Sequence, residues 1–112
     1  MLNQFVIVGR LVKDSELRET ETGKKITNIT LAVPRSYKNS NGEYDTDFIN
    51  CILWEGIAQN TTEYCKKGDL IGVKGRIQSR TVEKDEKTNY LTEMVAEKVT
   101  FLSSKKEEKA EE

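Results

Sequence analysis

The sequence contains no histidine, only two cysteines and a single proline among its 112 residues. Without histidine, Ser-His and Cys-His catalytic pairs are excluded, and zinc ligation loses its usual nitrogen donor. Cys51 and Cys65 fall in segments that we expect to be a strand and a helix, and nothing else indicates an oxidising compartment. We therefore predict two free thiols, no metal, no cofactor and no catalytic residues.

Paired carboxylates are the remaining route to acid-base chemistry. The adjacent pairs are Asp45 with Asp47 and Asp85 with Glu86, and both fall in segments expected to be loops. We interpret them as solvated loop charges. An enzyme is the weakest function class, because no nucleophile, metal cluster or phosphate-binding glycine loop is apparent in the sequence.

Long apolar runs are also missing. No stretch approaches the roughly 20 apolar residues that span a bilayer, and the first residues lack the basic start and small-residue cleavage site of a secretory signal. With 36% hydrophobic and 33% charged residues, the composition predicts one soluble, cytoplasmic globular domain that does not contact a membrane.

Net charge is low as well, at −1, although proteins that contact phosphates usually carry a basic surface. Residues 103–112 hold three lysines and four glutamates, so residues 1–102 carry 15 basic and 15 acidic side chains. Any basic surface must therefore come from the arrangement of charges along the chain. We predict a domain at 1–102 and a short, charged, disordered tail at 103–112.

Period-two alternation and turn residues predict the order of the elements. Strands are expected at 2–12, 26–33 and 46–54, with Pro34 ending the second and Asn41-Gly42 turning in a long hairpin loop. A helix follows at 55–67, with Gly68 as its cap. Strands at 70–82 and 90–102 flank a charged loop at 83–89, and the core positions expected in the last strand are Val95, Val99 and Phe101.

Three strands, one short helix and two more strands is the order of the oligonucleotide-binding (OB) fold, an all-β, five-stranded Greek-key barrel. Other small all-β barrels stay open from pattern alone. An SH3-like barrel would ordinarily lack the helix between the third and fourth strands.

Two of the expected strands present unusual outer faces. The third places Ile49, Cys51 and Leu53 on one side and Phe48 and Trp54 on the other. The fourth places Ile71, Val73 and Ile77 on one side, while the other side carries Lys74, Arg76, Gln78 and Arg80. Because the aliphatic faces already supply a core, the aromatic and basic side chains are expected to point outward.

Such a surface suits single-stranded nucleic acid. Stacking on an aromatic ring is worth roughly 1–3 kcal/mol per base and tolerates any sequence, and basic side chains beside it would contact phosphates. Tyr37, in the expected loop after the second strand, is a third stacking candidate. The alternative is a barrel whose aromatic face binds another protein, which the neutral charge of residues 1–102 favours.

Several segments resemble the bacterial-type single-stranded-DNA-binding protein family, in matching order and spacing over residues 1–102: MLNQFVIVGRLVKDSELRETETGKKI, TNITLAV, DFINCILWEGIAQN, YCKKGDLIGVKGRIQSR and YLTEMVAEKVTFL. The resemblance implies an OB fold and a homotetramer around which single-stranded DNA wraps. It also implies action at the nucleoid, with functions in DNA replication, recombination and repair.

The family's stacking aromatics fall on Tyr37, Phe48 and Trp54, and a fourth falls at or near Val82, which cannot stack. The full set of expected DNA-binding residues is Tyr37, Phe48, Trp54, Arg10, Arg35, Lys74, Arg76, Arg80 and Lys84. The family typically ends in an acidic tip with proline and phenylalanine that recruits partner enzymes. Here the chain ends Lys-Ala-Glu-Glu, so we expect a truncated or short form in which replication and repair proteins are not recruited through that tip.

Overall fold

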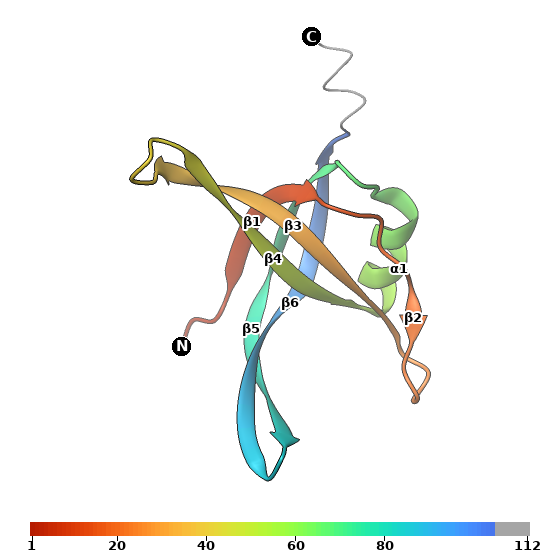
Figure 1. Cartoon of the computed structure of the whole chain (residues 1–112). Helices are drawn as coiled ribbons and strands as arrows, with labels where there is room; N and C mark the ends of the chain where they lie inside the picture. The colour runs from red at the N-terminus through yellow and green to blue at the C-terminus, as the bar shows by residue number, and fades with distance from the viewer. Residues whose placement is uncertain (105–112) are drawn as a thin grey trace.

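The structure, a computed structural model, describes residues 1–104, so the predicted tail from residue 105 onward lies outside the described residues. One short helix interrupts an otherwise all-β chain (Figure 1). The elements in order are β1 (Phe5–Leu11), β2 (Arg18–Glu19), β3 (Lys25–Lys38), β4 (Tyr44–Trp54), α1 (Glu55–Tyr64), β5 (Leu70–Lys84) and β6 (Lys87–Ser103).

Five of the strands close into a barrel. The strand order is β1-β5-β6-β4-β3, and β1 pairs again with β3 through Arg10–Ala32 and Leu11–Leu31. The closure between β4 and β6 is a parallel contact at Ile52–Val95. A closed five-stranded barrel with a helix between its third and fourth strands confirms the predicted OB fold. The short β2, which pairs with the start of β3, was not predicted because its two charged residues show no alternation.

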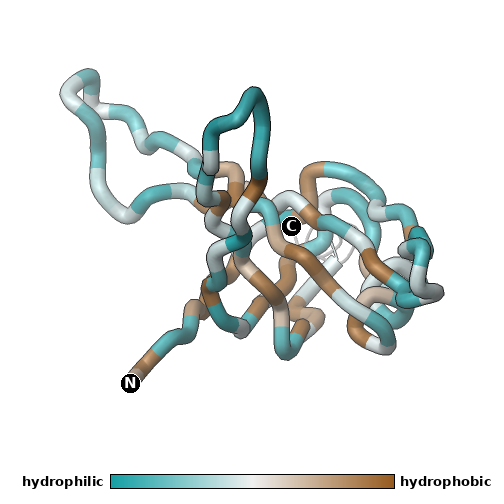
Figure 2. Tube along the Cα trace, turned by 90° about the horizontal axis from the view of Figure 1, so that it is seen from below, coloured by the Kyte–Doolittle hydropathy of each residue, from teal (hydrophilic) through white to brown (hydrophobic). Residues whose placement is uncertain are grey.

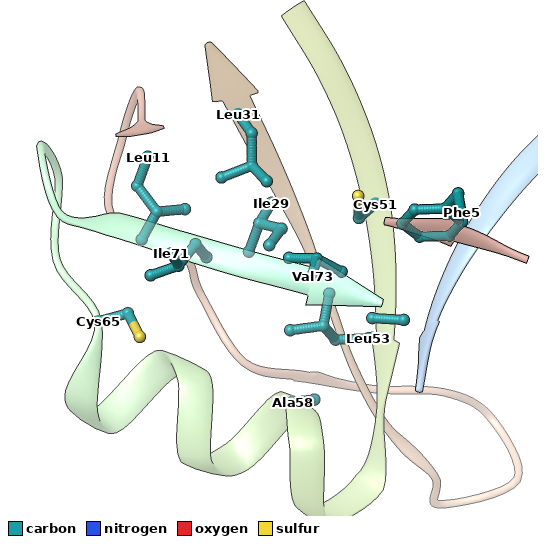
Figure 3. Packing of buried hydrophobic residues seen from close by; sticks show 11 residues of the cluster. Phe5, Leu11, Ile29, Leu31, Cys51, Leu53, Ala58, Cys65, Ile71 and Val73 are labelled. Carbon is teal, nitrogen blue, oxygen red and sulfur yellow. The ribbon is translucent and has the colours of Figure 1, made fainter. Parts of the chain in front are cut away.

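The barrel interior is filled by the aliphatic faces of the strands (Figure 3). Ile29 and Leu31 of β3 meet Cys51 and Leu53 of β4, and all four are fully buried. The remaining labelled members of this core are Phe5, Leu11, Ala58, Cys65, Ile71 and Val73. The predicted inner faces of the third and fourth strands are therefore confirmed for Cys51, Leu53, Ile71 and Val73, and partly for Ile49, which is half-buried and packs against the cluster.

Helix α1 covers one end of this core through Ala58. It ends at Tyr64, three residues earlier than predicted, with Cys65 in extended conformation and its N–H bonded to the Thr61 carbonyl. The prediction of Gly68 as the helix cap is wrong. Gly68 instead adopts φ +92° in a separate turn and donates its N–H to the Leu11 carbonyl at 2.8 Å, which ties the helix exit to β1.

Two hairpin arms continue beyond the barrel (Figure 1), and both are largely hydrophilic (Figure 2). The prediction that Pro34 ends its strand is wrong, because β3 continues to Lys38 and Pro34 pairs with Thr46. The register is irregular between Pro34 and Lys38. Where the arm has only two strands, one edge of β3 needs no partner, and a proline without an N–H is tolerated there.

The predicted loop at 83–89 is also wrong. Pairing between β5 and β6 continues to Lys84–Lys87, which leaves a two-residue turn at Asp85 and Glu86. Both adopt positive φ, 53° and 63°, the backbone of the tight hairpin turn that matches strand twist. The turn lacks the usual asparagine or glycine, so the sequence pattern did not indicate it.

The long β5–β6 arm also explains two wrong core predictions. Ile77 is 40% exposed and Phe101 is 45% exposed. Ile77 lies beyond the bulge at Lys74/Gly75, where the arm leaves the barrel, and Phe101 lies directly before a second irregularity at the opposite end of the strand pair. Val95 is buried and Val99 packs against the core, as predicted.

The two cysteines are free, as predicted, and both are buried. The prediction that Cys65 lies within the helix is wrong, because it directly follows α1. Burial raises the pKa of the Cys51 thiol to about 11, and burial together with the Asp69 carboxylate raises the pKa of Cys65. Both thiols are therefore held in the protonated, unreactive form at neutral pH. Within residues 1–104, no helix has the length and apolar character needed to cross a membrane.

Candidate nucleic-acid interface

The outer face of β4 presents Phe48 and Trp54 beside the barrel, and the third aromatic of the strand, Tyr44, is exposed farther out on the β3–β4 arm. Phe48 is 66% exposed, and Trp54, the last residue of the strand, is half-buried. Their neighbours in register on β3 are Ala32 and Ile26. With Cys51 and Leu53 completely buried on the opposite face, the two rings are not needed to fill the barrel and are available for contact from outside.

A hollow of about 300 Å³ lies beside Trp54 and is bounded by Lys24 and Glu55. An indole face next to a lysine offers a stacking surface and a cation for a phosphate in one place. Sequence reasoning did not identify Lys24, which follows the glycine turn before β3. Nothing in its local pattern distinguishes it from the other charged residues of that turn.

Tyr37 lies within β3, so its predicted position in a loop is wrong, but its side chain is 63% exposed on the β3–β4 arm. Val82, at or near which the resemblance implies a fourth aromatic, is half-buried in β5 and pairs with Asn89. Both positions therefore lie on hairpin arms rather than on the barrel itself. Tyr37 adds a ring on one arm, and Val82 adds none on the other.

Arg35 is held by two carboxylates of β4. Its Nε and Nη2 donate to Asp47 at 3.0–3.2 Å, and its Nη1 lies 3.7 Å from Asp45. The hydrogen bonds from Arg35 lower the pKa of Asp47, so that carboxylate stays ionised at neutral pH. The interpretation of Asp45 and Asp47 as loop charges is wrong, because both lie in β4, where they neutralise a predicted phosphate contact.

We expect Asp47→Asn to raise affinity for single-stranded DNA several-fold at low salt, since it releases Arg35 and removes a negative charge from this face. The slope of log affinity against log salt should become steeper by up to about 1, because one more phosphate contact releases one more counterion. Fluorescence anisotropy with labelled oligo-dT measures both quantities. Glu63→Gln on α1 is the matched change of charge, and an equal effect from it would contradict the role of the Arg35–Asp47 pair.

The basic row of β5 is exposed as predicted at Lys74, Arg76 and Arg80. β6 lies between β5 and β4 in the barrel, so these side chains do not adjoin the aromatic rings directly. Arg76 pairs with Val95, which in turn contacts Ile52 of β4, and this row connects the basic strand to the aromatic face. Lys74 pairs with Val6 and Lys98 instead.

The farther members of the row are linked to β6. The Arg80 Nε lies 3.3 Å from the Glu93 carboxylate, and Gln78 donates to the same carboxylate at 3.2 Å. Lys84 ends β5 beside the hairpin turn and pairs with Lys87. The arm thus carries basic side chains well past the barrel, with Arg80 partly neutralised.

Arg10 is half-buried on β1 and donates from Nη1 to the Gly68 carbonyl at 3.1 Å. It pairs with Ala32, which pairs with Phe48, so the row β1-β3-β4 brings Arg10 within two strands of an aromatic ring. This row places Arg10 on the same face of the sheet as Phe48, one strand farther away than the residues of β3.

The strands between the aromatics carry amide and hydroxyl side chains that sequence reasoning did not select. Asn28 and Thr30 of β3 lie in register with Ile52 and Asn50 of β4. The alternation that directs Phe48 and Trp54 outward also directs Asn50 outward, since it lies at an even-numbered position between them. Its β3 neighbours could not be assigned, because their register with β4 depends on the hairpin.

A model of the single-strand binding protein family matches residues 2–102, the whole barrel and both arms. The chain belongs to this single-strand binding protein family. The predicted resemblance is therefore confirmed over the length for which it was made, and the barrel described above is the family's OB fold.

Similar members of the single-strand binding protein family come from several bacteria. Single-stranded DNA-binding protein B of Bacillus subtilis is 50% identical over 111 residues, covering 98% of each chain. Single-stranded DNA-binding protein 3 of Listeria innocua is 51% identical over 94% of this chain and 66% of its own length. A third relative, Single-stranded DNA-binding protein 3 of Streptococcus agalactiae, is 44% identical over 94% of this chain and 77% of its own.

Proposed function

We propose that this protein binds single-stranded DNA along the outer face of the barrel, largely without sequence preference. Bases stack on Phe48 and Trp54, with Tyr37 extending the path onto the β3–β4 arm. Phosphates are contacted by the basic side chains around this face: Arg10, Arg35, Lys74, Arg76, Arg80 and Lys84. The observation that carries the proposal is the outward presentation of the β4 aromatics in front of a core that is complete without them.

Membership of the single-strand binding protein family and the names of the relatives support this function. We further infer a non-catalytic role in protecting single strands during replication, recombination and repair, in the cytoplasm at the nucleoid. Since residues 1–102 carry equal numbers of acidic and basic side chains, stacking has to contribute relatively more to affinity than phosphate attraction does.

Salt dependence tests this proposal. Labelled oligo-dT should be retained at low salt, and its log affinity should fall linearly with log salt because phosphate contacts release counterions. Oligonucleotides of equal composition but different order should bind alike, since stacking does not read base order. Failure to retain any oligonucleotide at low salt would contradict the proposal.

We propose in addition that the chain assembles as a homotetramer. Val6 and Val8 are 66% and 48% exposed on the outer face of β1, and exposed apolar patches of this kind mark protein interfaces. Light scattering of the protein alone should give a mass of about four chains, and a monomer mass would contradict this assembly. The same measurement with long oligo-dT reports how many chains bind each strand.

A further inference from the structure

Glu55 has an unusual backbone at the point where β4 ends and α1 begins. Its φ is +52°, in the left-handed region that a residue with a Cβ seldom adopts. Strain of this kind persists only where the surroundings hold it, and it gathers at functional positions. Because Glu55 directly follows Trp54, the strained turn sets the direction in which the chain leaves the indole.

Packing of the neighbouring side chains does not hold this turn. Glu55 and Gly56 are both exposed, and a Cβ added at Gly56 would meet nothing within 4 Å. Trp54, the residue that caps α1, makes no side-chain hydrogen bond to the helix. A hydrogen bond from outside the helix is therefore needed to fix the turn.

The Glu55 carboxylate makes that bond. The β3–β4 ladder reaches its last pair at Ile26–Trp54. Lys25, the preceding residue of β3, donates its N–H to Glu55 Oε1 at 3.0 Å, so the carboxylate continues the pairing one residue past the indole. A second link, from Lys25 Nζ to Gln59 Oε1 at 2.8 Å, joins the same residue of β3 to the next turn of α1.

The same bond holds Lys24 beside the indole. Lys24 is fixed within its own turn, because its N–H donates to Thr20 Oγ1 at 3.2 Å and its carbonyl accepts from Thr20 N at 2.8 Å. The bond between Lys25 and Glu55 ties this turn to the end of β4 (Figure 1). Lys24, Trp54 and Glu55 together bound the hollow of about 300 Å³, so loss of the bond would separate the aromatic ring from the cation beside it.

We propose that Glu55 is a positioning residue of the nucleic-acid interface, whose carboxylate holds Trp54 and Lys24 in the arrangement that stacks a base and contacts the adjacent phosphate. The inference rests on the proposed binding of single-stranded DNA across β4. Glu55 acts through these two residues, because a carboxylate offers no donor to a phosphate. The role requires a hydrogen-bond acceptor at position 55 but no negative charge.

Substitutions at position 55 test the need for an acceptor. Glu55→Ala removes it and should increase the fast local motion of the indole, measured in the protein alone by time-resolved anisotropy of Trp54 emission. Its affinity for oligo-dT at low salt should fall about 5-fold, the usual effect of losing one hydrogen bond. Glu55→Gln keeps an oxygen acceptor, so it should retain the indole motion of the unmodified protein and bind oligo-dT at least as tightly. Glu63→Ala, which removes an exposed carboxylate elsewhere on α1, should change neither quantity.

Glu55→Gly separates positioning from stability. Glycine lacks the acceptor but adopts a positive φ without strain, so this variant should melt at a higher temperature than Glu55→Ala and still free the indole and weaken binding. Unmodified affinity for oligo-dT in Glu55→Ala, or an equal loss in Glu55→Gln, would overturn the positioning role. Either result would leave the proposed function intact, since the unmodified protein still binds, whereas failure of the unmodified protein to bind oligo-dT would overturn both.

Discussion

Replacing Phe48 or Trp54 with alanine is expected to weaken binding of oligo-dT by about 5- to 150-fold for each ring, the equivalent of roughly 1–3 kcal/mol per stacked base. The effect is large because the face has few other sources of affinity. Residues 1–102 carry equal numbers of acidic and basic side chains, and Arg35 and Arg80 are each paired with carboxylates. Anisotropy titrations at fixed low salt measure the loss. Phe48→Tyr, which keeps an aromatic ring, should retain most of the affinity.

The matched control is Tyr64→Ala, which removes an aromatic side chain that is 74% exposed on helix α1, away from the β4 face. Its affinity for oligo-dT should be unchanged. If the Phe48 and Trp54 variants also bind DNA normally while losing contact with another protein, the aromatic face is a protein-binding surface instead. Because Trp54 is half-buried, thermal melting of the Trp54→Ala variant should be followed by circular dichroism alongside its DNA titration, to show that the fold is retained.

Gly75→Ala is expected to destabilise the fold strongly, and much more than the same substitution at Gly72, the other glycine of β5. A Cβ at Gly75 would lie 1.9 Å from the Val95 carbonyl oxygen and 2.9 Å from the Phe5 ring, so the backbone of β6 would have to move. Overpacking of this kind costs about 1–3 kcal/mol and occasionally more. For a domain of this size we expect the midpoint of thermal unfolding to fall by roughly 10 °C or more.

Gly72→Ala on the same strand is the control for this prediction. There an added Cβ would make ordinary contacts at 3.8–3.9 Å with Val8, Ile7 and Leu102. Its melting midpoint should stay within a few degrees of the unmodified protein. Equal melting midpoints for the two variants would contradict the close packing of β5 against β6 at the bulge.

Local alternation was sufficient to predict the two faces of β4. The inner face of β4 is fully buried and its outer face is not, so Cys51 and Leu53 alternate along the strand with the outward side chains of Phe48, Asn50 and Trp54. The same reasoning explains why the strands of the two hairpin arms could not be predicted. Beyond the barrel both faces of the β3–β4 and β5–β6 arms meet water, alternation disappears, and continuous strands were interpreted as loops.

Contacts between strands distant in sequence could not be predicted from local patterns at all. The barrel closes because β6 meets β4 in parallel at Ile52–Val95, a contact that no local pattern encodes. The Arg35–Asp47 pair likewise depends on the register of the β3–β4 hairpin. The aromatic half of the candidate site was therefore predictable, whereas the polar side chains between the rings and the neutralisation of its basic half required the folded barrel.

Trp54 is the only tryptophan in the chain, so its emission reports directly on the central claim that single-stranded DNA stacks across the outer face of β4. Titration with oligo-dT at low salt should quench this emission in a saturable way, and added salt should reverse the quenching as the strand is released. Binding of oligo-dT detected by anisotropy without any change in the emission of Trp54 would show that the strand follows another path. That result would contradict the account.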